Sequence, residues 1–280
     1  MPIIDTHQHL WDLDLFHYAW LDSSPTLNRS FGMADYLAAV EGLGVTKTVH
    51  VEADVDSLIC WRRLSTCCSS PLKRTVLWQV LWRAAGRNMM ILNPSLDKIA
   101  EDPKLKGIRR VLHTQPDELG RSRRFVGNVR QLAAYGLSFD ICVLDRQLPI
   151  AINLVRACPD VTFILDHCGV PRVKERVLDP WRTHIVELSS FPNVYCKISG
   201  LVAYADPLRW TAEDLRPYVE HVLSSFGWDR VMFGSDWPVC TVSASYQKWV
   251  ETLASLTEMA GAANQRKLFY ENAVRVYRLA

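Results

Sequence analysis

Two histidines separated by one residue stand near the start of the chain, in the stretch DTHQHLWD at residues 5–12. They follow a short apolar segment, so we expect a strand there, with the side chains of His7 and His9 on the same face. Imidazole nitrogens can bind a metal ion, or they can form hydrogen bonds with loop carbonyls that have a purely structural role. The pair by itself leaves both interpretations open.

Two further groups that can bind a metal stand at the ends of later apolar runs. His167 ends one run, in ILDHCG, and Asp236 ends another, in VMFGSDWPV. If both runs are parallel strands of one barrel, their carboxyl ends meet at the face where barrel enzymes place their active sites. Three histidines and an aspartate with an open position suit one divalent ion, with zinc expected, as Lewis acid and water activator. We predict that His7, His9, His167 and Asp236 hold this metal and that His167 and Asp236 are also catalytic.

Two cationic residues lie among apolar neighbours in predicted strands. Arg109 occurs in LKGIRRVLH, with His113 four residues later and past the strand's end, and Lys197 occurs in NVYCKISG. Buried cations are costly unless they pair with a carboxylate or bind a ligand. We predict a catalytic role for Lys197 and substrate binding for Arg109 and His113. Pairing with a buried carboxylate stays open for Lys197, and solvation stays open for Arg109 because Arg110 stands beside it.

Aromatic residues flank the predicted site. Trp11 and Trp237 follow the first and last of these motifs, and they could wall a substrate pocket or pack in the core. We predict that both contact substrate. His50 lies inside KTVHVEA, where a hydrogen-bonded core histidine is the favoured interpretation over a metal ligand.

The elements that would position these residues recur along the chain. Helical patterns separate the strand-like runs, which are apolar throughout rather than alternating, as in sheets buried on both faces. Eight strand–helix units in 280 residues predict an α/β fold, a single-domain distorted (β/α)8 TIM barrel, with a doubly wound open sheet as the rival. The expected strands are Pro2 to Asp5, Val45 to Ala53, Thr75 to Leu81, Leu105 to Leu112, Leu137 to Val143, Val161 to His167, Val194 to Gly200 and Arg230 to Asp236.

Residues 57–96 differ in composition from their flanks. They contain no Asp or Glu, although the whole chain has 30, and they hold three of the eight cysteines and three of the ten tryptophans. One interpretation is a basic surface helix followed by the third strand. The other is that the segment is altered or translated from a shifted reading frame, which an intact frame in the encoding DNA would contradict.

Composition excludes several classes of partner. The net charge of +2 and the lack of long basic runs argue against nucleic acid. No stretch of about 18 apolar residues occurs, and the first twenty residues carry acids where a signal peptide would be apolar. The cysteines form no C-x-x-C pair, so reduced thiols are expected. We expect a cytoplasmic protein with no membrane partner, and a homo-oligomer stays open.

Several motifs together resemble one known group. IIDTHQHLWD, KGIRRVLH, ILDHCGVP, NVYCKISGL and DRVMFGSDWPVC are similar to the amidohydrolase-related branch of the amidohydrolase superfamily, which contains fuconolactonase, rhamnonolactonase and sulfomuconolactonase. The resemblance covers residues 1 to about 54 and 96 to 280. It implies a distorted barrel that hydrolyses an ester or amide in a small ring, with one metal or none. KGIRR offers no lysine to bridge two metals, so a binuclear centre is not expected.

The resemblance implies a lactonase acting on a small lactone, with a sugar-acid lactone expected. Asp236 would take a proton from water, while a metal on His7 and His9, or these imidazoles with Arg109, would stabilise the oxyanion. Lys197 would meet the substrate's carbonyl or carboxylate. The alternatives are hydrolysis of a pyrone-dicarboxylate lactone or an amide, a metal-dependent decarboxylation, and an inactive barrel that only binds ligands.

Overall fold

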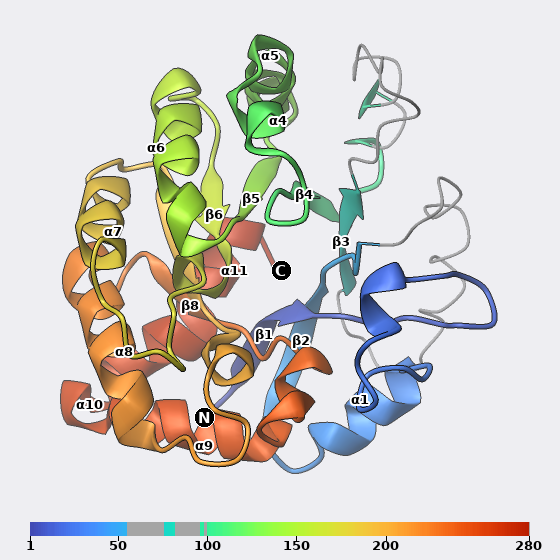
Figure 1. Ribbon diagram of the computed structural model, residues 1–280, viewed down its shortest axis with the longest axis vertical. Helices are drawn as coiled ribbons and strands as arrows, with labels where there is room; N and C mark the ends of the chain where they lie inside the picture. Colours follow the sequence, from blue (N-terminus) through green and yellow to red (C-terminus); the bar gives the residue numbers. More distant parts are fainter. Residues whose placement is uncertain (55–75, 82–95, 98–99, 280) are drawn as a thin grey trace.

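The computed structural model describes residues 1–54, 76–81, 96–97 and 100–279, with the backbone alone for 76–81. Eight parallel strands pair in chain order, from β1 to β8, and helices surround them (Figure 1). The strands are β1 Ile3–Gln8, β2 Val45–His50, β3 Val76–Leu81, β4 Leu105–Val111, β5 Ser138–Cys142, β6 Phe163–Leu165, β7 Val194–Ile198 and β8 Val231–Phe233.

The two ends of this sheet meet at the carboxyl end of β1. The Asp236 N–H donates to the His7 carbonyl at 2.7 Å, and the His9 N–H donates to the Trp237 carbonyl at 2.7 Å. Gln8 and Trp237 also form an isolated parallel bridge. These contacts join the segment after β8 to β1, so the fold is the predicted (β/α)8 TIM barrel, and the doubly wound sheet was the wrong alternative.

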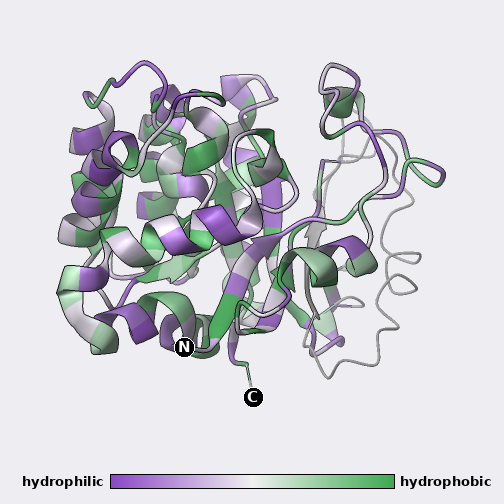
Figure 2. Cartoon of the chain, turned by 90° about the horizontal axis from the view of Figure 1, so that it is seen from below, coloured by the Kyte–Doolittle hydropathy of each residue, from purple (hydrophilic) through white to green (hydrophobic). Residues whose placement is uncertain are grey.

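The helices cover the outside of the barrel. Their hydrophilic and hydrophobic residues alternate along the chain, as expected of helices with one buried face (Figure 2). Local caps set several starts: the Ser122 hydroxyl accepts from the Phe125 N–H, and the Ser245 hydroxyl accepts from the Lys248 N–H. The α-helices with described bounds are α1 Met33–Ala39, α4 Asp117–Arg121, α5 Arg123–Gln131, α6 Leu148–Ala157, α7 Trp181–Ser189, α8 Ala212–Phe226, α9 Tyr246–Leu256, α10 Gly261–Arg266 and α11 Asn272–Tyr277.

The core has two parts. The larger part lies between the strands and the surrounding helices. The smaller part, called here the inner cluster, joins strand side chains to the C-terminal segment, and it consists of Ile4, Val49, Val51, Ile164, Met232, Ala273, Tyr277 and Leu279. All are at most 5% exposed. The C-terminal segment therefore contributes to the packing inside the barrel as well as to its outer layer.

The compositionally distinct segment 57–96 falls largely outside the described residues. Within it, the backbone of β3 pairs in parallel with β2 and β4, where the sequence predicted a strand. The hypothesis of a shifted frame stays a prediction. Among the described residues, no helix has the length and apolarity needed to cross a membrane.

Candidate active site

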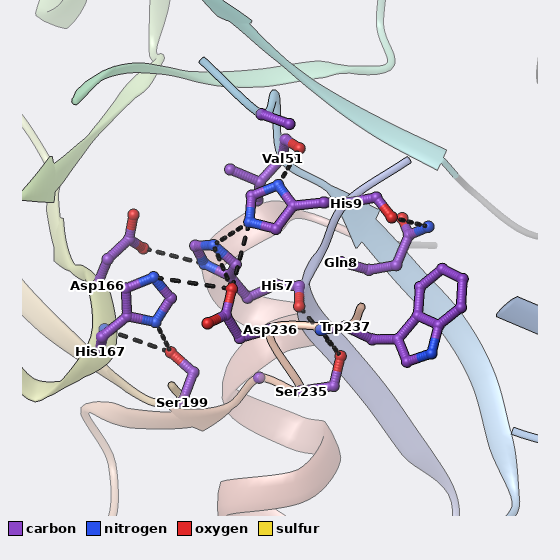
Figure 3. A network of polar contacts seen from close by, with 12 residues as sticks. His7, Gln8, His9, Val51, Asp166, His167, Ser199, Ser235, Asp236 and Trp237 are labelled. Atoms are coloured by element: carbon purple, nitrogen blue, oxygen red, sulfur yellow. Dashed lines mark hydrogen bonds and ion pairs between the residues drawn. The ribbon is translucent and has the colours of Figure 1, made fainter. Parts of the chain in front are cut away.

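His7 and His9 project into one buried space at the carboxyl end of β1, as their spacing predicted. Their Nε2 atoms lie 3.1 Å apart (Figure 3). The Nδ1 of His9 lies 2.7 Å from the Val51 carbonyl, which can only accept, so Nδ1 carries the proton and Nε2 presents a lone pair. Burial lowers the pKa of His9 to about 3 and that of His7 well below 6.5. Both rings are therefore neutral near pH 7.

Asp236 faces all three histidines of the predicted set. Its Oδ1 lies 3.3 Å from His9 Nε2, 3.8 Å from His7 Nε2 and 4.0 Å from His167 Nε2. The residue has a positive φ of 58° directly after β8, and its N–H is held by the His7 carbonyl. Burial raises the pKa of its carboxyl to about 6, against the opposing effects of His167 and Arg109. A carboxyl with such a pKa is a suitable general base near neutral pH.

His167 is oriented by Ser199, directly after β7. Its Nδ1 lies 2.9 Å from the Ser199 hydroxyl oxygen, which also accepts from the His167 N–H at 3.3 Å. The backbone of His167 has φ 53°, a left-handed conformation that turns the chain sharply after β6. Gly200 permits the close approach, because a Cβ there would lie 2.6 Å from His167 Nδ1.

The donor set fits a divalent metal. His9 Nε2 and Asp236 Oδ1 are both acceptors facing each other at 3.3 Å, which requires a proton or a cation between them. Neighbouring ligand atoms around a tetrahedral zinc are separated by about 3.4 Å, given a Zn–N bond of about 2.0–2.1 Å. Two groups that share His7 have suitably close atoms: His7, His9 and Asp236, and His7, Asp166 and His167.

Arg109 lies at the rim of this donor set. Its Nη1 is 3.4 Å from His7 Nε2 and 3.5 Å from Asp166 Oδ2, and its Nη2 donates to the Glu52 carbonyl. Burial would raise the pKa of Asp166, but Lys197, His7 and Arg109 together lower it well below 3.8. The guanidinium thus places positive charge next to the imidazoles, and the solvated alternative for Arg109 does not apply, since it is 5% exposed.

Lys197 is fully buried and surrounded by acceptors. Its Nζ lies 2.5 Å from Asp140 Oδ2, 3.1 Å from Asp166 Oδ1 and 3.3 Å from His7 Nδ1. Two of these three neighbours are carboxylates, which compensate the charge of the ammonium. This geometry favours pairing with buried carboxylates, the alternative that the sequence left open, over direct contact with substrate.

The other predicted substrate contacts are His113, Trp11 and Trp237. His113 is half-buried, with Nδ1 3.5 Å from Cys142 Sγ, and burial lowers its pKa to about 4. Trp11 donates from Nε1 to the Arg29 carbonyl at 2.7 Å. Trp11 and Trp237 each pack edge-on against Phe31, at ring distances of 5.3 and 5.5 Å. The two tryptophans belong to an aromatic cluster, and their contact with substrate stays a prediction.

Three acidic side chains around this site were not singled out from the sequence. Asp166 stands directly before His167, where its place inside an apolar strand was a usable signal. Asp140 lies inside β5, and its role as the ion-pair partner of Lys197 is visible only in the folded structure. Asp5 accepts hydrogen bonds from Ser235 Oγ at 2.6 Å, Tyr36 Oη at 2.9 Å and the backbone N–H groups of Ser235 and His7. It fixes β1 to the segment that carries Asp236.

Comparisons with known proteins identify the family of the chain. A family model described as amidohydrolase matches residues 4–279. L-fucono-1,5-lactonase of Burkholderia multivorans is 31% identical over 300 residues, which cover 99% of this chain and 96% of that protein. The 4-sulfomuconolactone hydrolase of Rhizobium radiobacter is 24% identical over 245 residues, which cover 84% of this chain and 75% of that protein.

A solved structure gives the same result for the fold. The crystal structure of an amidohydrolase from Burkholderia multivorans with bound zinc matches with a TM-score of 0.87 and 27% identity, covering 100% of both chains. The family match spans nearly the whole chain, as do the lactonase relative and this structure. The chain therefore belongs to the amidohydrolase family and is a hydrolase with its TIM-barrel fold.

Proposed function

We propose that this protein hydrolyses a small lactone, with a sugar-acid lactone as the expected substrate. The observation that carries the proposal is the position of Asp236 Oδ1, within 4.0 Å of three imidazoles at the carboxyl ends of β1 and β6. The L-fucono-1,5-lactonase relative supports the substrate class. The predicted metal ligands His7, His9, His167 and Asp236 are the residues that would hold one zinc ion.

The residues of the chain supply the proton transfers. When bound, a zinc ion would act as a Lewis acid and lower the pKa of water. Asp236 takes a proton from the attacking water as the water oxygen bonds to the lactone carbonyl carbon. The ring carbon–oxygen bond then breaks, and Asp236 returns the proton to the leaving alkoxide. Arg109, next to His7, places positive charge where the carbonyl oxygen becomes negative.

Metal analysis combined with a substrate panel tests this proposal. We expect purified protein to contain about one zinc per chain and to release protons from aldonolactones in a pH-stat. Activity should fall after chelation and return with zinc. Chelated protein that retains full activity would instead support the metal-free form, in which His7, His9 and Arg109 stabilise the oxyanion directly.

The same panel separates the alternative reactions. It should include a pyrone-dicarboxylate lactone, a cyclic amide and aromatic acids that could lose carbon dioxide. Turnover of one of these in place of the aldonolactones would contradict the proposed substrate class. A folded protein that binds a lactone without turning it over would support the inactive barrel.

A further inference from the structure

A buried ion-pair network extends behind the imidazoles, on the side away from Asp236. Lys197 on β7 pairs with Asp140 on β5 at 2.5 Å and with Asp166, which follows β6, at 3.1 Å. All three side chains are 0% exposed. The network therefore joins three neighbouring strands inside the barrel, where each charge depends on its partners.

The inner cluster lies beside this network at Tyr277. The ring of Tyr277, in α11, has its centroid 5.9 Å from Lys197 Nζ, and Tyr277 is 1% exposed. Charges interact strongly in an apolar environment, and removing one partner leaves the other uncompensated. The positions of Asp140, Lys197 and Asp166 are therefore mutually fixed, and a change at one is transmitted to the others.

The network ends at the ring of His7. Asp166 Oδ1 lies 3.3 Å from His7 Nδ1, and the same oxygen lies 3.1 Å from Lys197 Nζ. If His7 binds a metal through Nε2, its proton must reside on Nδ1, and Asp166 Oδ1 is the carboxylate oxygen that faces this nitrogen, at ion-pair distance. A carboxylate that accepts the second N–H of a metal-bound histidine fixes the tautomer and orientation of the ring.

We propose that Asp140 and Lys197 are positioning residues for the metal site, acting on His7 through Asp166. Asp140 holds the ammonium, the ammonium holds Asp166 Oδ1, and this oxygen holds the Nδ1 side of His7 so that Nε2 faces His9 and Asp236. The inference rests on the metal-binding form of the proposed function. It replaces direct substrate contact as the role of Lys197.

The test measures zinc affinity, by competition with a chromogenic chelator, in the variants Asp140→Asn and Lys197→Met. Groups that orient metal-binding histidines change metal affinity by about 10–100-fold when mutated. We expect about 10-fold weaker zinc binding for D140N and a larger loss for K197M. The matched control is Thr257→Val, which removes a buried hydroxyl bonded to the Leu253 carbonyl in the outer helical layer. It should lower the melting temperature and leave zinc affinity unchanged.

Kinetics at saturating zinc distinguish positioning from substrate contact. We expect both variants to regain a KM near that of the wild type once zinc is restored. A KM that stays high in K197M at saturating zinc, with unchanged zinc affinity, would overturn the proposal in favour of substrate contact. If K197M does not fold, D140N decides, because asparagine keeps the shape and one acceptor oxygen.

Two results would overturn the inference outright. One is a folded D140N variant whose zinc affinity equals that of the wild type, and the other is a wild-type protein that binds no zinc. Failure of the proposed function has a different signature, since the wild type would then bind zinc and turn over no lactone.

Discussion

The surroundings of Asp236 set the pKa of its carboxyl. Burial raises the pKa of its carboxyl to about 6, while nearby His167 and Arg109 limit the increase. The imidazoles of His7 and His9 are kept neutral by the same burial, so they offer lone pairs rather than positive charge. One carboxylate base facing neutral nitrogens can thus serve either a metal or a bare water molecule.

We expect Asp236→Asn to fold normally and to lose lactonase activity. The amide has the shape of the carboxyl but cannot take a proton from water, so kcat should fall by about 10²–10⁴-fold. Steady-state kinetics and a thermal melt measure the two effects. Asp14→Asn, at an exposed position, is the control and should behave as the wild type. Near-full turnover by D236N would remove Asp236 from the role of base.

At the scale of elements, the strand ends position the histidines. Two glycines on neighbouring turns leave room for the imidazole side chains. A Cβ on Gly234, just after β8, would lie 2.8 Å from the His7 Cβ. A Cβ on Gly200, just after β7, would lie 2.6 Å from His167 Nδ1, and Gly200 also has a positive φ of 66°. The turns after β7 and β8 therefore require glycine where they pass close to His167 and His7.

Gly200→Ala should displace His167 and lower kcat/KM, by about tenfold or more if a misplacement near 1 Å follows. Gly227→Ala is the matched control, because Gly227 has a similar positive φ of 70° but nothing within 4 Å of an added Cβ. Both variants should lose stability through backbone strain, and only G200A should lose activity beyond that. Equal kcat/KM values in the two variants would show that the close approach of Gly200 to His167 does not affect activity.

For the whole molecule, buried neutral histidines make stability depend on pH. Burial, with His9 and Arg109 nearby, lowers the pKa of His50 from 6.5 to about 3. The unfolded chain binds a proton at this residue below about pH 6.5, and the native chain does not. The free energy of unfolding should therefore decrease as the pH falls from 6.5 towards 3.

His50→Gln should reduce this loss, because glutamine does not titrate. Melting temperatures at pH 7.5 and pH 5, measured with a chelator present, should differ less in H50Q than in the wild type. His17→Gln is the control, since the His17 side chain is 66% exposed, and its melting temperatures should fall as in the wild type. An unchanged difference in H50Q would show that His50 does not contribute to the acid sensitivity.

The sequence by itself determined the barrel and the end of it at which the four predicted ligands lie. Two of the predictions used local patterns, namely the strand-like runs and the spacing of His7 and His9. Local patterns of this kind can be read without knowing the fold, and the run at 75–81 is found as a strand. Strand ends of a parallel barrel meet at one face, so His167 and Asp236 could be placed beside His7 and His9. In a parallel barrel, the direction of the chain alone decides at which end of the barrel each strand terminates.

Only the tertiary structure decided which charges meet inside the barrel. Lys197 is separated by 57 positions from Asp140, and both lie on strands that read as uniformly apolar. Which of several buried acids faces a buried cation depends on the register and tilt of neighbouring strands, and no local pattern encodes these. For the same reason, Trp11 could be placed near the site by sequence, while its packing against Phe31 required the fold.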